Sequence, residues 1–339
     1  MDIAEVTDVE SFDKWLAERS LSGLWGRERA GDFKPWLWKW DDIHTALVKA
    51  GEVIGLDFVN RRDVNLVNPT TGIGRPSKTV SGTLQYLMPG DVARAHRHSA
   101  ATARWVIQGD DAAYSVVEGE AFPVMEGDLL VAPSMAWHDH FHKGTKPTIW
   151  LSSLDNQFTQ LTHSFGDNYP ATQQPIEKPQ GWSALTAGAT RAATVDQEFV
   201  PPPYSYRWAD TYASLMALKA REEADPHDGI RIDFKNPVDG GPTFPTMACS
   251  VQLLTPHEVT RPHRHNSTVL YQAFRGTGAT VVDGQRLEWS EGDIFVVPPW
   301  ALHHHENARG EDTILYSISD EPVWRALHLY REEAVDGGA

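Results

Sequence analysis

The sequence predicts an all-β protein that is built from two copies of one small double-sheet barrel and carries a few peripheral helices. The first observation is an internal repeat, in which residues 93–140 and residues 260–305 share one order of histidine, glycine and proline. The second is the spacing of short apolar runs, which glycines interrupt at the distance typical of β-hairpins. Because there are only two copies, each copy is a whole barrel rather than one rung of a solenoid.

The first copy begins with two histidines in the pattern H-x-H, His96 and His98. Alternate side chains of an extended strand face the same side, so both imidazoles point into one cavity. His138 stands at the end of another apolar run and can complete a set of three. Three neutral imidazoles that leave coordination positions open suit a divalent first-row metal such as iron, and by residue type alone zinc, manganese or nickel. Histidines that merely fill a core would not require the H-x-H pair twice.

The second copy places His263, His265 and His303 in the corresponding positions and therefore forms a second candidate metal site. Its strand carries Tyr271 where the first copy carries Arg104. The residue types allow a metal in both barrels, and they leave open whether the second barrel holds one.

The spacing G-x5-H-x-H, followed by G-D-x4-P-x4-H, resembles the two motifs of the cupin family, so the chain looks like a bicupin with two double-stranded β-helix (jelly-roll) barrels. The first copy is similar in more detail to the gentisate 1,2-dioxygenase family, which also includes ring-cleaving enzymes for salicylate and 1-hydroxy-2-naphthoate. The similarity lies in ARAHRHSAATARWVIQG, in RRDVNLVNP before it and in WHDHFHKGTKPTIWLSSLD after it. It covers most of the chain, from about Leu24 to the second barrel.

This resemblance implies an extradiol-type cleavage, in which O2 opens a salicylate-type 2-hydroxybenzoate between its carboxyl-bearing and hydroxyl-bearing carbons. It implies iron(II) at His96, His98 and His138, a small aromatic acid and O2 as substrates, and a homotetramer. Arg104 would hold the substrate carboxylate, and His140 would take the proton of the substrate hydroxyl. Arg104 has the strand parity of His98 and therefore points inward. Its alternative role is an ion pair with an internal acid.

Further substrate contacts follow from matches to the family pattern and from departures. Arg61 and Arg62 match an Arg-Arg element of the family, and only one of them is expected to face the pocket. Ser152 stands where gentisate enzymes usually carry an aspartate, and the small residues usual before the H-R-H strand are Ser81 and Thr83. These features disfavour gentisate, whose 5-hydroxyl would lose a partner. They favour a salicylate with a 5-nitro group, a 5-halide or no 5-substituent.

The chain is expected to divide into four parts. These are an N-terminal helical and aromatic arm (1–60), a catalytic barrel (61–156), a linker with a helix (157–229) and a second barrel (230–330). Hydrophobic periodicity predicts helices over residues 9–19, 41–50 and 210–223. Asp128 and Asp293, each after a glycine, are expected to be turn residues rather than catalytic acids. The acidic, glycine-ended tail is expected to be frayed.

Composition excludes several classes of function. The net charge is −16, from 30 basic against 46 acidic residues. This charge argues against nucleic acid and anionic membrane surfaces as partners, because both require a basic footprint. No apolar run approaches the ~20 residues of a transmembrane helix, and the acidic N-terminus lacks a signal-peptide core. A single cysteine, Cys249, excludes an internal disulfide. The protein is therefore expected to be soluble and cytoplasmic.

Two other functions fit the same motifs. A non-catalytic bicupin, acting as a sensor or a store, would keep both barrels but would not need Arg104 or the Arg-Arg element. A metal-dependent isomerase or decarboxylase would use the metal site but would not consume oxygen. Oxygen uptake by iron(II)-loaded protein with a panel of salicylates distinguishes these alternatives.

Overall fold

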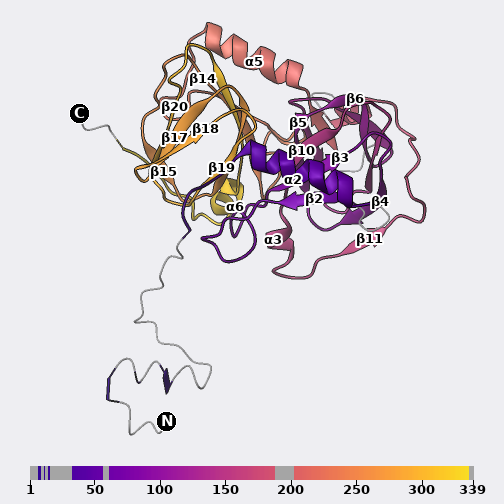
Figure 1. The fold of residues 1–339 in the computed structure, drawn as a ribbon, viewed down its shortest axis with the longest axis horizontal. Helices are drawn as coiled ribbons and strands as arrows, with labels where there is room; N and C mark the ends of the chain where they lie inside the picture. The colour runs from indigo at the N-terminus through magenta and orange to yellow at the C-terminus, as the bar shows by residue number, and fades with distance from the viewer. Residues whose placement is uncertain are drawn as a thin grey trace. The chain divides into compact units, whose positions relative to one another are not determined.

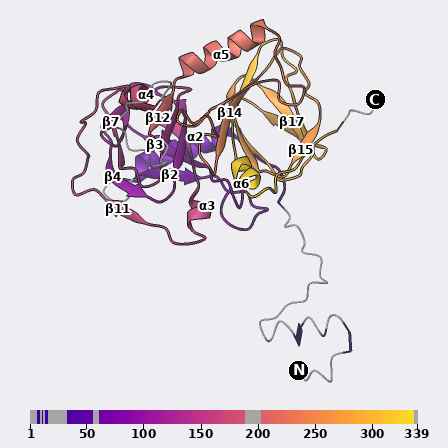
Figure 2. The ribbon, with the colours of Figure 1, turned by 180° about the vertical axis from the view of Figure 1, so that it is seen from behind.

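The chain forms two antiparallel β-barrels, each made of two sheets, and the barrels lie side by side in both views (Figures 1 and 2). The computed structural model describes residues 7, 8, 11, 14, 15, 33–55, 61–187 and 202–335. Within them, Lys34 begins the compact unit that contains both barrels. The predicted all-β architecture with a few peripheral helices is confirmed. No described helix is long and apolar enough to cross a membrane.

Barrel 1 has one sheet of order β12-β8-β5-β10-β3-β2 and one of order β11-β4-β9-β6-β7. The bounds, in chain order, are β2 (Arg62–Asn65), β3 (Thr83–Leu87), β4 (Val92–His98), β5 (Thr102–Gln108), β6 (Asp110–Val117), β7 (Glu120–Val124), β8 (Leu129–Ala132), β9 (His138–His142), β10 (Thr148–Leu154), β11 (Gly166–Asn168) and β12 (Tyr204–Tyr206). The last two strands come from the connection between the barrels, which therefore covers barrel 1 and does not merely span a gap.

Barrel 2 has one sheet of order β1-β19-β16-β21-β14-β13 and one of order β18-β17-β20-β15-β22. Its strands are β1 (Trp36–Trp38), β13 (Ile230–Asp233), β14 (Ala248–Leu254), β15 (His263–His265), β16 (Val269–Arg275), β17 (Gly278–Val282), β18 (Gln285–Trp289), β19 (Ile294–Val297), β20 (His303–Glu306), β21 (Thr313–Ser319) and β22 (Glu332–Ala334). The helices are α2 (Trp40–Val53), α3 (Asn156–Thr159), α4 (Trp182–Ala187), α5 (Trp208–Ala220) and α6 (Glu321–Ala326).

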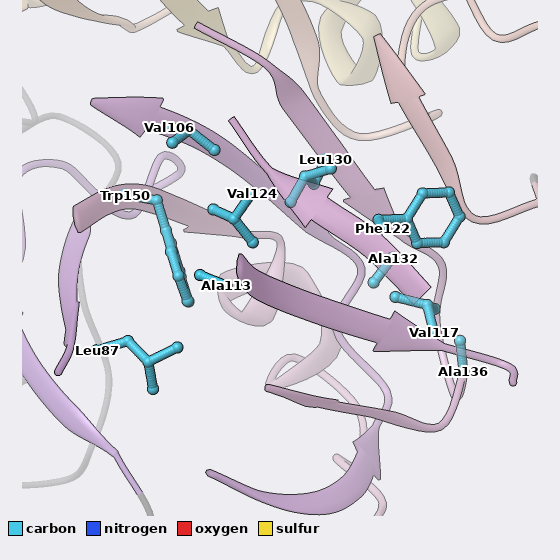
Figure 3. Close-up of a cluster of buried hydrophobic side chains, with 10 residues drawn as sticks. All are labelled: Leu87, Val106, Ala113, Val117, Phe122, Val124, Leu130, Ala132, Ala136 and Trp150. Atoms are coloured by element: carbon cyan, nitrogen blue, oxygen red, sulfur yellow. The ribbon is translucent and has the colours of Figure 1, made fainter. Parts of the chain in front are cut away.

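An apolar cluster fills part of the interior of barrel 1 (Figure 3). Its side chains alternate with outward-facing ones, as the two-residue period of a strand requires. Trp150 of β10 pairs with Val106 of β5, and the next inward pair on these strands is Ser152 with Arg104. The apolar cluster therefore borders a polar region of the same barrel.

The two barrels exchange a strand. The segment that precedes barrel 1 in the chain begins with β1, which pairs with β19 of barrel 2. The segment that precedes barrel 2 contains β12, which pairs with β8 of barrel 1. Each following helix then reaches the other barrel, since α2 contacts β2 and β3 while α5 contacts β13 (Figure 1). The barrels are thus joined twice, each time by a segment that precedes one barrel in the chain and adds a strand to the other.

The starts of these two helices are held in the same way. Asp293 accepts a hydrogen bond from the backbone N–H of Trp40 at 2.7 Å, and Asp128 accepts one from the N–H of Trp208 at 2.7 Å. The glycines before these aspartates have φ of +91° and +79°, and a Cβ there would lie 2.4 and 2.6 Å from the two indole rings. Each Gly-Asp pair is therefore a turn, as predicted, and also the docking point of a helix.

An aromatic contact joins the barrels at their centre. Trp105 of β5 faces away from the interior of barrel 1 and stacks on Tyr316 of β21, with ring centroids 4.4 Å apart. Its indole Nε1 donates to Oε1 of Gln272 on β16 at 3.0 Å. Because Trp105 is fully buried, this surface is part of the core and not a loose contact between domains.

The structure confirms some local predictions and corrects others. The helices predicted over residues 41–50 and 210–223 are α2 and α5, and the second begins two residues earlier than predicted. The helix over residues 9–19 falls largely outside the described residues. The tail was wrongly predicted to be frayed in Glu332–Ala334, which forms β22 and pairs with β15. The division of the chain into four parts stays a prediction.

We predict that Asp293→Ala lowers the free energy of unfolding by about 1–3 kcal/mol, because it leaves a buried helix start without its acceptor. Its side chain is 4% exposed and also pairs with Lys39 at 2.7 Å. The matched control is Asp312→Ala, which breaks a partly exposed pair with Lys219 and is expected to cost less than about 1 kcal/mol. Urea midpoints of both variants test this, and equal midpoints would contradict it.

Candidate metal centre

Three histidines converge inside barrel 1 from two neighbouring strands. His96 and His98 lie on β4, and His138 begins β9 directly opposite His96 in the register. One nitrogen from each ring lies within 4.8 Å of the other two. The ring centroids of His96 and His138 are 4.3 Å apart, and those of His98 and His138 are 4.9 Å apart. The structure therefore brings together the three residues that were predicted as metal ligands.

Backbone carbonyls set the orientation of all three rings. The Nδ1 atoms of His96, His98 and His138 lie 2.9, 2.8 and 3.0 Å from the carbonyl oxygens of Arg94, Ala100 and Ala136. Nδ1 must donate in these hydrogen bonds, so Nε2 of each ring carries the free lone pair. Nε2 of His138 is buried and has no hydrogen-bond partner among the residues that the structure describes. These residues therefore fit a divalent metal ion, which such oriented imidazoles bind through Nε2.

The same histidines are neutral at physiological pH. Burial, followed by the charge of Arg61, lowers the pKa of His96 to about 3. Burial, followed by the charge of Arg104, lowers the pKa of His98 to about 4 and that of His138 well below its usual value. Neutral imidazole is the form that coordinates a metal, so the site requires no deprotonation before the metal binds.

Of the two neighbouring arginines, Arg61 is the one that enters the site. Its Nη2 lies 2.5 Å from Nε2 of His96. Arg62 instead pairs with Asp91 and donates from Nε to the carbonyl oxygen of Ile54 at 2.7 Å. A metal ion and Arg61 compete for the same lone pair of His96, so the guanidinium must leave this nitrogen when the metal binds.

Arg104 brings a second positive charge to the interior. It pairs in register with Ser152 on β10, which in turn pairs with Thr83 on β3, so the three side chains share one inward face. Arg104 is 2% exposed, and its Nε and Nη1 have no hydrogen-bond partner among the described residues. Burial, followed by the charge of Arg61, lowers the pKa of Arg104 to about 9. A buried guanidinium in this state is costly unless an anion joins it.

The other predicted substrate residues differ in what they offer. His140 is fully buried, and neither of its nitrogens has a partner in the described part of the chain. Thr83 donates from Oγ1 to Oδ1 of Asn65 at 2.7 Å. The Ser81 hydroxyl is engaged with the backbone of Leu154, to which it donates at 2.9 Å and from which it accepts at 2.7 Å. His140 is thus free to bind a ligand, whereas Ser81 mainly holds the end of β10.

Two residues of this region were missed by the sequence analysis. Gln85 lies on the same inward face as Thr83, is buried, and has an unpartnered Nε2. Asp63 pairs with Gln85 in register, and its carboxylate interacts electrostatically with both Arg61 and Arg104. Strand parity was the available signal, because Gln85 follows Thr83 by two positions.

Barrel 2 repeats the arrangement of the three histidines. One nitrogen of each of His263, His265 and His303 lies within 4.8 Å of the other two. Nδ1 of His265 lies 3.1 Å from the carbonyl oxygen of Ser267, and Nδ1 of His303 lies 3.0 Å from that of Ala301. Nε2 of His303 is buried without a partner. The second candidate metal site therefore has the same spacing of ring nitrogens as the first, but Nδ1 of His263 has no hydrogen-bond partner among the described residues.

Comparison with known proteins agrees with this geometry. The family model described as the cupin domain matches residues 83–154 and 250–319. The chain is 35% identical over 342 residues to a 5-aminosalicylate 1,2-dioxygenase of a Comamonas species, covering 97% of this chain and 91% of that one. It is 35% identical over 350 residues to a gentisate 1,2-dioxygenase of a Haloferax species, covering 96% of both. The chain belongs to the gentisate and salicylate 1,2-dioxygenase family.

A solved structure supports this family assignment. The crystal structure of a salicylate 1,2-dioxygenase from Pseudaminobacter salicylatoxidans superposes with a TM-score of 0.86 at 26% identity, covering 97% of this chain and 99% of that one. Membership in the gentisate and salicylate 1,2-dioxygenase family confirms both the resemblance predicted from the motifs and the bicupin fold.

For this family member we predict that His138→Ala abolishes metal binding in barrel 1 and activity with it. Loss of one of three ligands is expected to exceed the about 10–100-fold loss of affinity that follows removal of a residue that only orients a ligand. His163→Ala, at an exposed position, is the matched control. His263→Ala is expected to retain at least about a tenth of the rate, because catalysis is assigned to barrel 1. An active His138→Ala together with an inactive His263→Ala would show that the wrong barrel was chosen.

Proposed function

We propose that this protein is an iron(II)-dependent dioxygenase that opens the ring of a salicylate-type 2-hydroxybenzoate. The observation that carries the proposal is a buried Arg104 whose Nε and Nη1 have no hydrogen-bond partner among the described residues and whose side chain lies on the interior face beside three neutral histidines. This combination suits a substrate that brings a carboxylate to the arginine and a hydroxyl to the metal. The names of the relatives, which include 5-aminosalicylate and gentisate dioxygenases, support the same substrate class.

The reaction adds both atoms of O2 to the substrate. The bond between the carboxyl-bearing and hydroxyl-bearing carbons breaks, and a 2-oxo-dienedioate forms. The cleavage is extradiol-type in the sense that the broken bond does not lie between two hydroxylated carbons. Iron(II), when bound at His96, His98 and His138, supplies the redox chemistry that allows O2 to react with the ring.

The arginines position the substrate. Arg104 would bind the carboxylate through charge-assisted hydrogen bonds, and its fixed place on β5 would orient the ring. Arg61 must leave His96 when the site is loaded, and the same carboxylate gives it a partner. The two guanidiniums, which repel each other, would then share one anion.

His140 is the proton acceptor in this proposal. It is buried on β9 two residues after His138, and its ring centroid lies 6.1 Å from that of His138. Burial lowers its pKa well below the usual value. It is therefore neutral and able to accept a hydrogen bond from the phenolic group beside the metal.

The substituent at the 5-position is proposed to meet Ser152. Its hydroxyl can donate to a nitro group and tolerates a halide, where a carboxylate would repel either. One relative, at 30% identity over 123 residues, is a 5-nitrosalicylic acid 1,2-dioxygenase of a Bradyrhizobium species. We therefore propose a substituted salicylate as the preferred substrate and gentisate as a poorer one.

We also propose that the protein is a homotetramer, as the resemblance to the family implies. Exposed apolar side chains on the connection around barrel 1, including Leu161 and Phe165, provide surface for a subunit contact. Light scattering coupled to size exclusion tests this proposal, and a monomeric mass would contradict it.

Oxygen uptake tests the proposed function. Protein loaded with iron(II) is mixed with salicylate, its 5-nitro and 5-halo derivatives and gentisate, and oxygen is followed with an electrode. Uptake stoichiometric with substrate loss supports the dioxygenase. Substrate loss without uptake would indicate the isomerase or decarboxylase alternative, and binding without turnover would indicate a non-catalytic bicupin.

We predict that Arg104→Ala lowers kcat/KM for salicylates by tenfold to hundredfold, which corresponds to about 1.5–3 kcal/mol for a lost charge-assisted contact. Metal content is expected to be unchanged, because Arg104 is not a ligand. Arg104→Lys, which keeps the charge without the planar fork, should recover part of the loss. Equal loss of metal and activity in Arg104→Ala would mean that the arginine is structural.

Ser152→Asp tests the assignment of the 5-position. The unmodified protein is predicted to have a higher kcat/KM for 5-nitro- or 5-halosalicylate than for gentisate, and the variant to shift this ratio toward gentisate. A missing polar partner in a closed pocket costs about 1–3 kcal/mol, which is enough to reorder substrates. The control is Ser152→Ala, which removes the hydroxyl without adding a carboxylate. A tenfold preference of the unmodified protein for gentisate would refute the assignment.

A further inference from the structure

Two histidines of the second triad line a cavity of barrel 2. This cavity has a volume of about 800 Å³ and is lined by His263 and His265, by Tyr271, and by several ionised side chains. The proposed ring cleavage does not use it. The second triad shares two features with the first. Backbone carbonyls orient the rings of His265 and His303, and Nε2 of His303 is buried without a hydrogen-bond partner among the described residues.

The surroundings of the two triads differ in charge. Tyr271 pairs with Ser317 in the register that places Arg104 opposite Ser152 in barrel 1. The buried guanidinium of barrel 1 is therefore replaced by a neutral phenol. Burial raises the pKa of Tyr271 far above its usual value, so the phenol stays uncharged.

Arg231, which lines the cavity of barrel 2, is paired with carboxylates. Arg231 donates from Nη1 to Oδ2 of Asp228 at 2.7 Å and from Nε to Oδ1 of Asp233 at 3.1 Å. Burial is the largest influence on Asp228 and opposes its ionisation, but the attractions of Arg231 and His263 and the hydrogen bond from Arg231 together outweigh burial and hold the pKa of this carboxyl below its usual value. Asp228 thus accompanies Arg231 beside the second triad, and Asp233 is shared between Arg231 and Lys235, whereas beside the first triad Asp63 interacts with both Arg61 and Arg104.

These charges act in opposite directions on a cation at the two triads. The Asp228 carboxylate lines the same cavity as His263 and His265, so its negative charge favours a cation at the second triad. The buried guanidinium of Arg104 lies on the interior face of barrel 1, so its positive charge disfavours a cation at the first triad. A cation in barrel 1 therefore gains from an anion that joins Arg104, and a cation in barrel 2 does not.

We propose that barrel 2 holds a second metal centre that binds a divalent cation without a co-bound anion, whereas the centre in barrel 1 binds its cation and an aromatic carboxylate cooperatively. The existence of the second centre is independent of the proposed function. The cooperativity in barrel 1 rests on it, because it requires the carboxylate to bind Arg104. Reciprocity demands that the metal raise salicylate affinity by the same factor as salicylate raises metal affinity.

Anaerobic titration of the metal-free full chain with Co²⁺, against a competing chelator, tests the proposal. Unmodified protein is expected to bind two equivalents, and His96→Ala and His263→Ala one each. Salicylate is expected to tighten Co²⁺ binding at least tenfold in His263→Ala, which retains the barrel 1 site. In His96→Ala, which retains the barrel 2 site, the change should be less than twofold, and this variant also corrects for any Co²⁺ bound by free salicylate.

Asp228→Asn separates the charge argument from the histidine geometry. It is expected to weaken Co²⁺ binding in the His96→Ala background at least fivefold, while Tyr271→Phe in that background leaves it unchanged. One equivalent in unmodified protein and none in His96→Ala would overturn the second centre. Equal tightening of both sites by salicylate, or no effect of Asp228→Asn, would overturn its electrostatic basis. Two equivalents without any effect of salicylate in His263→Ala would refute the cooperativity in barrel 1 and leave the second centre intact.

Discussion

The buried charge of Arg104 is the constraint on which the interior of barrel 1 depends. A guanidinium at this depth is unfavourable without an anion, and the nearest acid, Asp63, is shared with a second arginine. Burial, followed by the same charge, lowers the pKa of His98 and His138, and the charge also opposes a cation between them. A ligand that carries a carboxylate resolves both conflicts at once, since it gives the arginines a partner and reduces the repulsion felt by the metal. The carboxylate of the proposed substrate would therefore complete the charge balance of the site.

The scaffold keeps this arrangement in place by joining the barrels reciprocally. Trp105 follows Arg104 on β5 and points the opposite way, into the contact with Tyr316 and Gln272 of barrel 2. The strand that carries the buried arginine is thus held from its other face by the second barrel. The exchanged segments β1–α2 and β12–α5 add two further connections, each anchored at a Gly-Asp turn. A second barrel without a ring-cleaving role would still be required for the position of Arg104.

The histidine triads could be predicted from sequence because strand parity and an internal repeat are local signals. His96, His98 and Arg104 share strand parity, and the structure places all three side chains in the interior of barrel 1. The choice between Arg61 and Arg62 could not be predicted, because both flank the start of a strand whose register was unknown. Gln85 was within reach of the same parity rule, but no motif drew attention to it. The exchange of β1 and β12 between barrels depends on pairing between strands far apart in sequence, which periodicity does not reveal. The tail strand β22 was missed for the same reason, since its acidic composition resembles that of a frayed terminus.

The two barrels place similar histidine triads among different charged residues. Tyr271 replaces Arg104, and an ion pair of Arg231 with Asp228 stands where barrel 1 has two guanidiniums that share Asp63. These differences concern a few inward positions, while the strands and the triads are repeated closely. The proposed difference in function between the barrels therefore depends on the charges around each triad and not on the triads themselves.

The most direct test of the account is the fate of oxygen during turnover of salicylate by the iron(II)-loaded protein under ¹⁸O₂. Mass spectrometry of the product is expected to show a ring-opened dienedioate that contains both labelled atoms of one O2 molecule. Release of carbon dioxide without label in the organic product would contradict the account, as would a product that keeps its ring and gains a single labelled oxygen.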